Sequence, residues 1–333
     1  MKKIISLFTV ISLIFSLSAC KKEEETLKEI TPVTEVEETN EFYEKITSST
    51  SRPIAVMIDN DSEAARPQTG LEDAFVIYEM MVEGAATRMM ALFLDSDLEK
   101  VGPVRSSRHY FLDYVLENDA LYAHCGYSPQ AASDINTLGV NSLNEISNNN
   151  GINYFRDNTK GAPHNLFTNF PELLSYAKSI GYKLETDKKR VFTFKTADEE
   201  ISAGETANKI VLPYSYAYTV SYEYNSEKGK YDRYINGEEH MSESSNDVLS
   251  AENILVYKVT NYSIDSVGRQ NLENIGSGSG YYISNGKCVP ITWSKSSRSE
   301  QTVYKTENGE QLVLNPGNTF VQIVPQSADI TIE

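Results

Sequence analysis

The sequence predicts an α+β protein in two parts: a mixed α/β sandwich-type domain at residues 52–188, followed by a β-rich domain at residues 189–333. In the first part, apolar strand-like runs alternate with helix-like runs, which favours an α/β arrangement. In the second part, short strand-like runs are separated by turn residues such as Asn-Gly and Pro-Gly. An export signal at residues 1–19 and an acidic, flexible tether at residues 20–51 precede both parts.

The first twenty residues have the pattern of a lipoprotein signal peptide. Two lysines precede an apolar run at residues 4–17, which is too short to span a bilayer comfortably, and small residues stand directly before Cys20. A plain secretory signal or an uncleaved anchor would not require that cysteine. Cleavage before Cys20, followed by addition of diacylglycerol and an acyl chain such as palmitate, would give lasting anchorage. We therefore expect a lipid-anchored protein on the extracytoplasmic face of the cell membrane, with the lipid bilayer as a partner.

The composition limits the remaining partners. The chain has 47 acidic residues against 30 Lys and Arg, a formal net charge of −17, which argues against nucleic acid and against adhesion to anionic headgroups. Besides Cys20, the chain contains Cys125 and Cys288. An oxidising compartment would permit a bridge between them, but two cysteines are not a disulfide framework, and two small buried thiols are the favoured alternative.

Each element of the first part follows from its apolar pattern and its boundary residues. Residues 74–95 read as two strands around a turn at Glu83 and Gly84, and Pro129 and Pro171 stand in the first turns of two helices. The expected strands are 52–60, the two within 74–95, and 119–126; the expected helices are 106–118, 128–139 and 170–182.

The second part carries strong turn signals. Asn236-Gly237 predicts a hairpin, residues 252–265 contain a plausible central strand, and the tail through residue 325 reads as a meander. Twelve of the 21 tyrosines lie between Tyr214 and Tyr304. They could stack on sugars, but tyrosines filling strands account for most of them. The turns of the meander carry Asn285-Gly286, Asn308-Gly309 and Pro316-Gly317.

Two arginines stand at the expected start of the helix at residues 106–118. Arg105 and Arg108 are three apart, and Ser106 or Ser107 would be the N-cap. Cations at a helix N-terminus oppose the helix dipole, so a negative group is expected between them. That group is either an anionic ligand or a carboxylate of the protein itself. The candidate acid partners are Asp73, Glu79 and Glu83, with Asp95 and Asp97 also from neighbouring strands.

Other polar side chains are expected to converge on the same place. Ligands of open α/β sheets bind beyond the carboxyl ends of the strands, and His124 ends a predicted strand. Arginine and histidine together favour phosphate, pyrophosphate or carboxylate. The candidate anion-binding residues are Arg66, Arg88, Arg105, Arg108, His124, Arg156, His164 and Asn165.

Signatures of catalysis are absent from the sequence. There is no Gly-x-Ser-x-Gly elbow, no His-Glu-x-x-His and no Cys-x-x-Cys, and the four histidines are too scattered to define a metal site. We therefore assign no catalytic residue, metal or cofactor from the sequence.

Several ordered blocks resemble the YerB-like lipoprotein family of Gram-positive bacteria. They include "VGPVRSSRHYFLDY" and "APHNLFTN" in the first part and "GSGSGYYISNGKCVPITWSK" in the second, and the resemblance extends from Arg52 to Pro325. It implies two domains of unassigned function behind a lipidated cysteine. Cys125 stands where a small residue such as Ala would be expected, which argues against a functional thiol. The resemblance implies no catalytic role for any residue, but it places six residues within the family's motifs: Arg66, Arg88, Arg105, Arg108, His124 and His164.

The order of strands and arginine-bearing turns is also similar to the site layout of LytR-CpsA-Psr transferases, which act on polyprenyl pyrophosphate. Three hypotheses follow. The favoured one is a module that binds an anionic cell-envelope ligand, such as a cell-wall polymer or a polyprenyl phosphate. The second is an envelope phosphotransferase or hydrolase in which Arg105 and Arg108 clamp phosphate and Asp73 or Glu79 acts as base or holds Mg²⁺ or Mn²⁺. The third is a non-catalytic scaffold for membrane protein complexes, in which these charges are internal ion pairs and the partner is an envelope protein.

Overall fold

A computed structural model describes residues 40–146, 153–201 and 203–333, which belong to one compact unit. The export signal, Cys20 and most of the expected tether lie outside these residues. Helix α1 (Glu41–Ser48) falls within the range expected to be tether; the Asn40 side chain caps it by accepting from the Phe42 N–H at 2.9 Å, and Ile46 is buried. The folded part therefore begins earlier than the expected residue 52. None of the helices described is long and apolar enough to cross a membrane.

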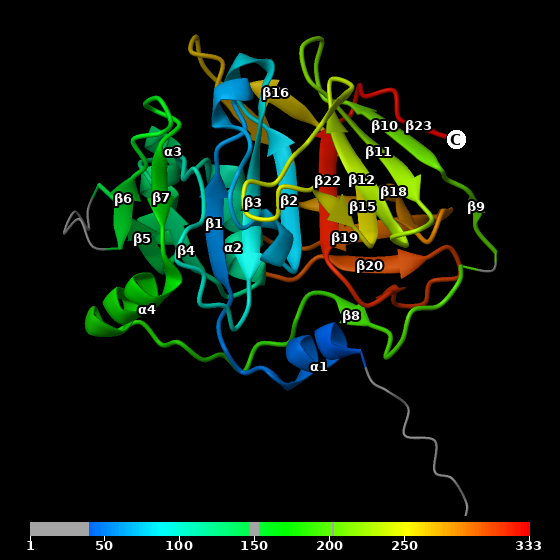
Figure 1. The fold of residues 1–333 in the computed structure, drawn as a ribbon, viewed down its shortest axis with the longest axis horizontal. Coiled ribbons are helices and arrows are strands. Elements are labelled where there is room, and N and C mark those ends of the chain that lie inside the picture. The colour runs from blue at the N-terminus through cyan, green and yellow to red at the C-terminus, as the bar shows by residue number, and fades with distance from the viewer. Residues whose placement is uncertain (1–39, 147–152, 202) are drawn as a thin grey trace, which may run out of the picture. The chain divides into compact units, whose positions relative to one another are not determined.

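One large mixed sheet runs through both predicted parts (Figure 1). Its strand order is β20-β19-β18-β15-β22-β2-β3-β1-β4-β5, and β9 pairs with β19. The strands are β1 (Ile54–Ile58), β2 (Val76–Met81), β3 (Thr87–Phe93), β4 (Leu121–His124), β5 (Ser142–Asn144), β9 (Glu205–Thr206), β15 (Asn253–Val259), β18 (Gly276–Ser284), β19 (Lys287–Lys295), β20 (Val303–Thr306) and β22 (Thr319–Pro325).

The two predicted parts meet within this sheet. Strand β22 lies parallel to β2, with Val76 opposite Thr319, and also parallel to β15 on its other side. Backbone hydrogen bonds thus join strands from the two sides of the boundary expected between residues 188 and 189. In Figure 1, α3 and α4 gather near β4 and β5 at one end of the sheet, and the strands of the second part occupy the other end. The mixed sheet with few helices confirms the predicted α+β class.

A second sheet and three short strand pairs complete the fold. The second sheet has the order β13-β12-β11-β10-β23, with β14 beside β12. It is formed by β10 (Lys209–Pro213), β11 (Thr219–Asn225), β12 (Lys230–Ile235), β13 (Glu238–Glu239), β14 (Ser250–Ala251) and β23 (Thr331–Ile332). The pairs are β6 (Tyr154–Arg156) with β7 (Leu166–Thr168), β8 (Thr193–Phe194) with β21 (Val313–Leu314), and β16 (Asn261–Ser263) with β17 (Gln270–Leu272).

Most expected elements are present. Two expected helices are α3 (Pro129–Thr137) and α4 (Phe170–Ser179). The Asn-Gly turns form as predicted, because Asn236 and Asn285 both adopt the positive φ that such hairpins require. Most tyrosines of the second part fill the core, although Tyr216, Tyr262 and Tyr281 are exposed.

The helix expected to start at Ser106 or Ser107 begins later. Short 3-10 helices occur at η1 (Glu63–Ala65), η2 (Leu71–Asp73), η3 (Glu83–Ala85) and η4 (His109–Phe111); η4 leads into α2 (Leu112–Glu117). The Arg105 N–H donates to the Met57 carbonyl at 2.8 Å, and the Ser107 N–H donates to the Gly126 carbonyl at 3.0 Å. These long-range bonds hold the segment extended. Arg105 and Arg108 therefore do not share a helix face.

Candidate functional site

The candidate site lies where three neighbouring parallel strands end. Strand β4 pairs in parallel with β1 on one side and with β5 on the other. The carboxyl ends of all three therefore lie at one edge of the sheet, where open sheets with parallel strands place their ligands. The chain leaves β1 through Asp59, Asn60 and Asp61 and leaves β4 through Cys125. We call this edge, with Asp59, Asp61 and the side chains that contact them, the strand-end site.

Two carboxylates form the centre of the strand-end site. Asp59 is fully buried; its Oδ2 lies 3.1 Å from Nε of Arg105 and 2.7 Å from Nδ1 of His164. Asp61 lies 3.1 Å from both Arg88 Nη2 and Arg105 Nη2. Burial acts to lower the pKa of Arg88, but the charge and hydrogen bond of Asp61, together with the charges of Glu83 and Asp59, outweigh it, and the pKa is raised. Three of the predicted anion-binding residues are thus held by the protein's own carboxylates.

Arg108 has a separate partner. Its guanidinium forms two contacts with Glu83, one of them between Nε and Oε2 at 2.9 Å. Burial acts to raise the pKa of Glu83, but the hydrogen bond and charge of Arg108 outweigh it, and the pKa is lowered. Of the three expected acid partners, Glu83 alone contacts one of the two arginines.

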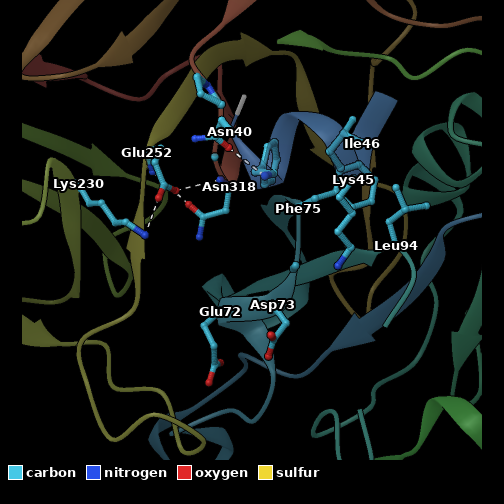
Figure 2. Close-up of a pocket in the computed structure, with 14 residues that line it drawn as sticks. Asn40, Lys45, Ile46, Glu72, Asp73, Phe75, Leu94, Lys230, Glu252 and Asn318 are labelled. Atoms are coloured by element: carbon cyan, nitrogen blue, oxygen red, sulfur yellow. Dashed lines mark hydrogen bonds and ion pairs between the residues drawn. The ribbon is translucent and has the colours of Figure 1, made fainter. Parts of the chain in front are cut away.

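Glu79 and Asp73 lie elsewhere. Glu79 points into the interior of the protein and pairs with Arg233. Asp73 lines a cavity of about 250 Å³ beside α1, where Figure 2 shows it near Glu72 and Lys45. Burial and then the neighbouring Glu72 raise the pKa of Asp73. Their expected role as base or metal ligand at Arg105 and Arg108 is wrong, because β2 directs Glu79 inward and η2 carries Asp73 to a different cavity.

His124 is structural rather than part of a cationic crevice. Its Nδ1 lies 2.8 Å from the Gly126 carbonyl and its Nε2 lies 2.7 Å from Ser142 Oγ, while its ring stacks on Tyr122. Burial lowers its pKa to about 4. The imidazole is consequently neutral near neutral pH and cannot attract an anion as a cation would.

Two predicted arginines contact amide oxygens, although Glu63, Glu238 and Glu239 line the same cavity as Arg66. Arg66 Nη1 donates to Asn60 Oδ1 at 3.3 Å, and Arg156 Nη1 donates to Asn165 Oδ1 at 2.9 Å. Within the part of the chain that the structure describes, neither forms an ion pair. Burial and then Glu145 raise the pKa of the Cys125 thiol to about 11. The charges of Arg156 and Arg105 oppose this rise, so Arg156 lies near the end of β4.

A buried polar network fixes the turn after β1. His240 Nε2 lies 2.6 Å from Gln68 Oε1, and Gln68 Nε2 donates to the Asp59 carbonyl at 2.9 Å. Asn60 Nδ2 donates to Thr87 Oγ1 at 2.9 Å. Fully bonded buried groups of this kind hold a single conformation, so Asp59 and Asp61 are presented rigidly.

Asp59, Asp61 and Ser62 are not among the residues that the sequence predicts for the site. The signal that could reveal them is the polar run Asp59-Asn60-Asp61-Ser62 directly after a buried strand. Cys125 and Cys288 are both free thiols, so the bridge that an oxidising compartment would permit is not formed. Among the described residues, no group of three or more His, Cys, Asp or Glu side chains is arranged to hold a metal ion.

Fold and site together define a two-part α+β protein whose mixed sheet is completed by its C-terminal half. The chain belongs to the family called "Protein of unknown function (DUF3048)": the N-terminal domain model matches residues 39–183 and the C-terminal domain model matches residues 210–321. It is 27% identical to "Putative lipoprotein YerB" of Bacillus subtilis, over 98% of this chain and 96% of that protein. The crystal structure of the Bacillus subtilis YerB protein matches with a TM-score of 0.75 and 28% identity, covering 84% of this chain and 94% of that one.

Proposed function

We propose that this chain is a lipoprotein, lipid-anchored through Cys20 on the extracytoplasmic face of the cell membrane, that binds an anionic cell-envelope ligand at the strand-end site. The likeness to "Putative lipoprotein YerB" and the signal pattern before Cys20 support the anchor. The ligand would carry phosphate, pyrophosphate or carboxylate, the groups whose geometry a guanidinium matches.

The observation that carries the proposal is the contrast between two sets of arginines. Arg88, Arg105 and Arg108 are paired with Asp61, Asp59 and Glu83, as the scaffold hypothesis requires. Arg66 and Arg156 contact the protein's amide oxygens instead. Their remaining N–H donors and their charge are therefore available to an anion.

Chain connectivity relates the contacts of these two arginines. Arg66 bonds Asn60, the residue after Asp59, and Arg156 bonds Asn165, the residue after His164. His164 and Asp59 are themselves in contact at 2.7 Å. Each arginine thus contacts a residue next in sequence to one member of a touching pair, and we propose that both guanidinium groups hold one ligand.

The test is calorimetric titration of the full-length protein with inorganic pyrophosphate. Arg66→Gln with Arg156→Gln should weaken binding at least tenfold, because a hydrogen bond to a charged group contributes about 1.5–3 kcal/mol. The matched control is Lys209→Gln with Lys228→Gln, which changes net charge equally at lysines paired with Glu223 and Asp247. Equal affinity in both double variants would refute the proposal and leave the charges of the site as internal ion pairs.

A further inference from the structure

A serine, a histidine and a buried carboxylate form a connected array inside the strand-end site. His164 Nδ1 lies 2.7 Å from Asp59 Oδ2, and His164 Nε2 lies 3.4 Å from Ser62 Oγ. Asp59 is inaccessible, the His164 side chain is 16% exposed and Ser62 is partly exposed. The carboxylate is therefore desolvated, while the hydroxyl can be reached from solvent.

The partners of the imidazole determine which nitrogen carries its proton. An ionised carboxylate only accepts hydrogen bonds, so Nδ1 must donate to Asp59. Asp59 Oδ1 also accepts from the Asp61 N–H at 3.1 Å, which fixes the carboxylate group. In neutral His164, Nε2 is then an unprotonated acceptor directed at the Ser62 hydroxyl. This is the arrangement in which a histidine can take a proton from a serine.

We propose that Ser62 is the nucleophile of an acyl-transfer centre, with His164 as its general base and Asp59 as the positioning residue. The substrate would be a carboxylic ester that also bears a phosphate or carboxylate group. This rests on the proposed function, because the same arginines would hold the anionic group. Arg66 directly follows η1, the single turn that begins after Ser62, and so lies close to the reacting hydroxyl along the chain.

The reaction balances with water as the second substrate. Ser62 Oγ attacks the ester carbonyl carbon as His164 Nε2 removes its proton, and the tetrahedral intermediate collapses with cleavage of the bond to the alcohol oxygen. His164 returns the proton to that leaving oxygen, which leaves the acyl group on Ser62. Water, deprotonated by the same imidazole, then releases the acid and restores the serine.

Two features of the site fit this chemistry. A nucleophile and its base are commonly somewhat farther apart before substrate binds, so 3.4 Å is within reach of a working pair. Arg105 contacts the same oxygen of Asp59 as His164 does, so a guanidinium and an imidazole together hold the carboxylate that positions the base. Such arrays are recognised by geometry rather than by local sequence, so the missing Gly-x-Ser-x-Gly elbow does not argue against it.

The test uses an alkyl fluorophosphonate on the full-length protein, read by intact mass and peptide mapping. Ser62 Oγ would attack phosphorus, fluoride would leave, and the protein would gain the probe mass less HF. Ser62→Ala should abolish labelling, whereas Ser133→Ala, at an exposed serine of α3, should label like wild type. His164→Gln should slow labelling at least a hundredfold. Asp59→Asn should lower the maximal labelling rate while leaving the probe concentration for half-maximal rate unchanged, a split that general loss of structure would not give.

Pyrophosphate binding separates this inference from the proposed function. If wild type binds pyrophosphate but Ser62 is not labelled, the acyl-transfer centre is refuted and the binding function stands. If Ser62 is labelled without pyrophosphate binding, the nucleophile is supported and the binding function is refuted.

Discussion

Glu79 on β2 and Arg233 on β12 form an ion pair, 2.8 Å between Oε2 and Nη2, in which both side chains are completely buried. The two residues come from the two predicted parts of the chain. Arg233 also donates to Tyr222 at 2.8 Å and to Nδ1 of His240 at 2.9 Å, and Glu79 accepts from Gln322 at 3.0 Å. Both charges in this cluster have partners. Because Glu79 belongs to the large sheet and Arg233 to the second sheet, the ion pair joins the two sheets.

Replacing one partner of this pair should destabilise the protein strongly. Arg233→Met leaves a buried carboxylate without its cation, and the free energy of unfolding should fall by about 3–5 kcal/mol. Urea denaturation of the full chain measures this. Arg269→Met, which breaks a partly exposed pair with Asp265, should cost at most about 1 kcal/mol. Glu79→Gln combined with Arg233→Met should cost less than Arg233→Met alone. Equal losses in the single and double variants would show that the charge pairing is not what stabilises the cluster.

His124 should make stability depend on pH below neutrality. Its pKa is about 4 in the folded protein, because of burial, and 6.5 in the unfolded chain. As pH falls, His124 therefore takes up its proton in the unfolded chain before it does so in the folded protein. The free energy of unfolding keeps its full value above about pH 6.5 and falls by about 3 kcal/mol as pH drops to about 4. His124→Gln should reduce the difference in unfolding free energy between about pH 7 and pH 4.5 by about 2–3 kcal/mol. The same difference in both proteins would mean that the ring is protonated in the fold.

The individual elements were predictable because their signals are local. The buried strands, the prolines at the starts of α3 and α4, and the Asn-Gly turns at Asn236 and Asn285 depend on neighbouring residues. The shared sheet was not predictable in this way, since the register that sets Val76 opposite Thr319 joins opposite ends of the chain. The helix expected from Ser106 or Ser107 begins later for a similar reason: the extended conformation around Ser107 depends on distant carbonyl groups.

The sequence predicted the types of residue in the candidate site better than it predicted which residues contact one another there. The sequence indicated which arginines were of interest, but their pairing depends on loops that approach only in the folded chain. Arg105 meets Asp59 and Asp61 because the segment after Pro103 pairs with β1, a contact between distant positions. His164 reaches Asp59 across 105 residues of sequence. Helix and strand periodicity relates only residues that are near each other in the sequence, so it could not predict these contacts.

Cys125 and Cys288 should remain unbridged and react slowly. Burial raises the pKa of the two thiols to about 11 and about 12, so very little thiolate exists at pH 8. Native protein should react slowly with a maleimide. Protein unfolded in denaturant without reductant should react rapidly at both cysteines. The mass of the peptides that contain them gives the number of labels. Failure to label either cysteine in denaturant until reductant is added would demonstrate a disulfide.

Gly280 should be required where β18 passes between β15 and β19. It is buried and stands opposite Tyr257 of β15. A Cβ at this position would overlap the Val256 carbonyl oxygen and lie 2.9 Å from Cβ of Tyr257, and backbone atoms of a central strand cannot move aside as a flexible side chain could. Gly280→Ala should therefore lower the free energy of unfolding by about 1–3 kcal/mol or more. Gly161→Ala is the matched control, because a Cβ there meets no atom within 4 Å and should change stability by less than about 0.5 kcal/mol. Equal urea midpoints for the two variants would mean that β15 and β18 are spaced more widely than their register implies.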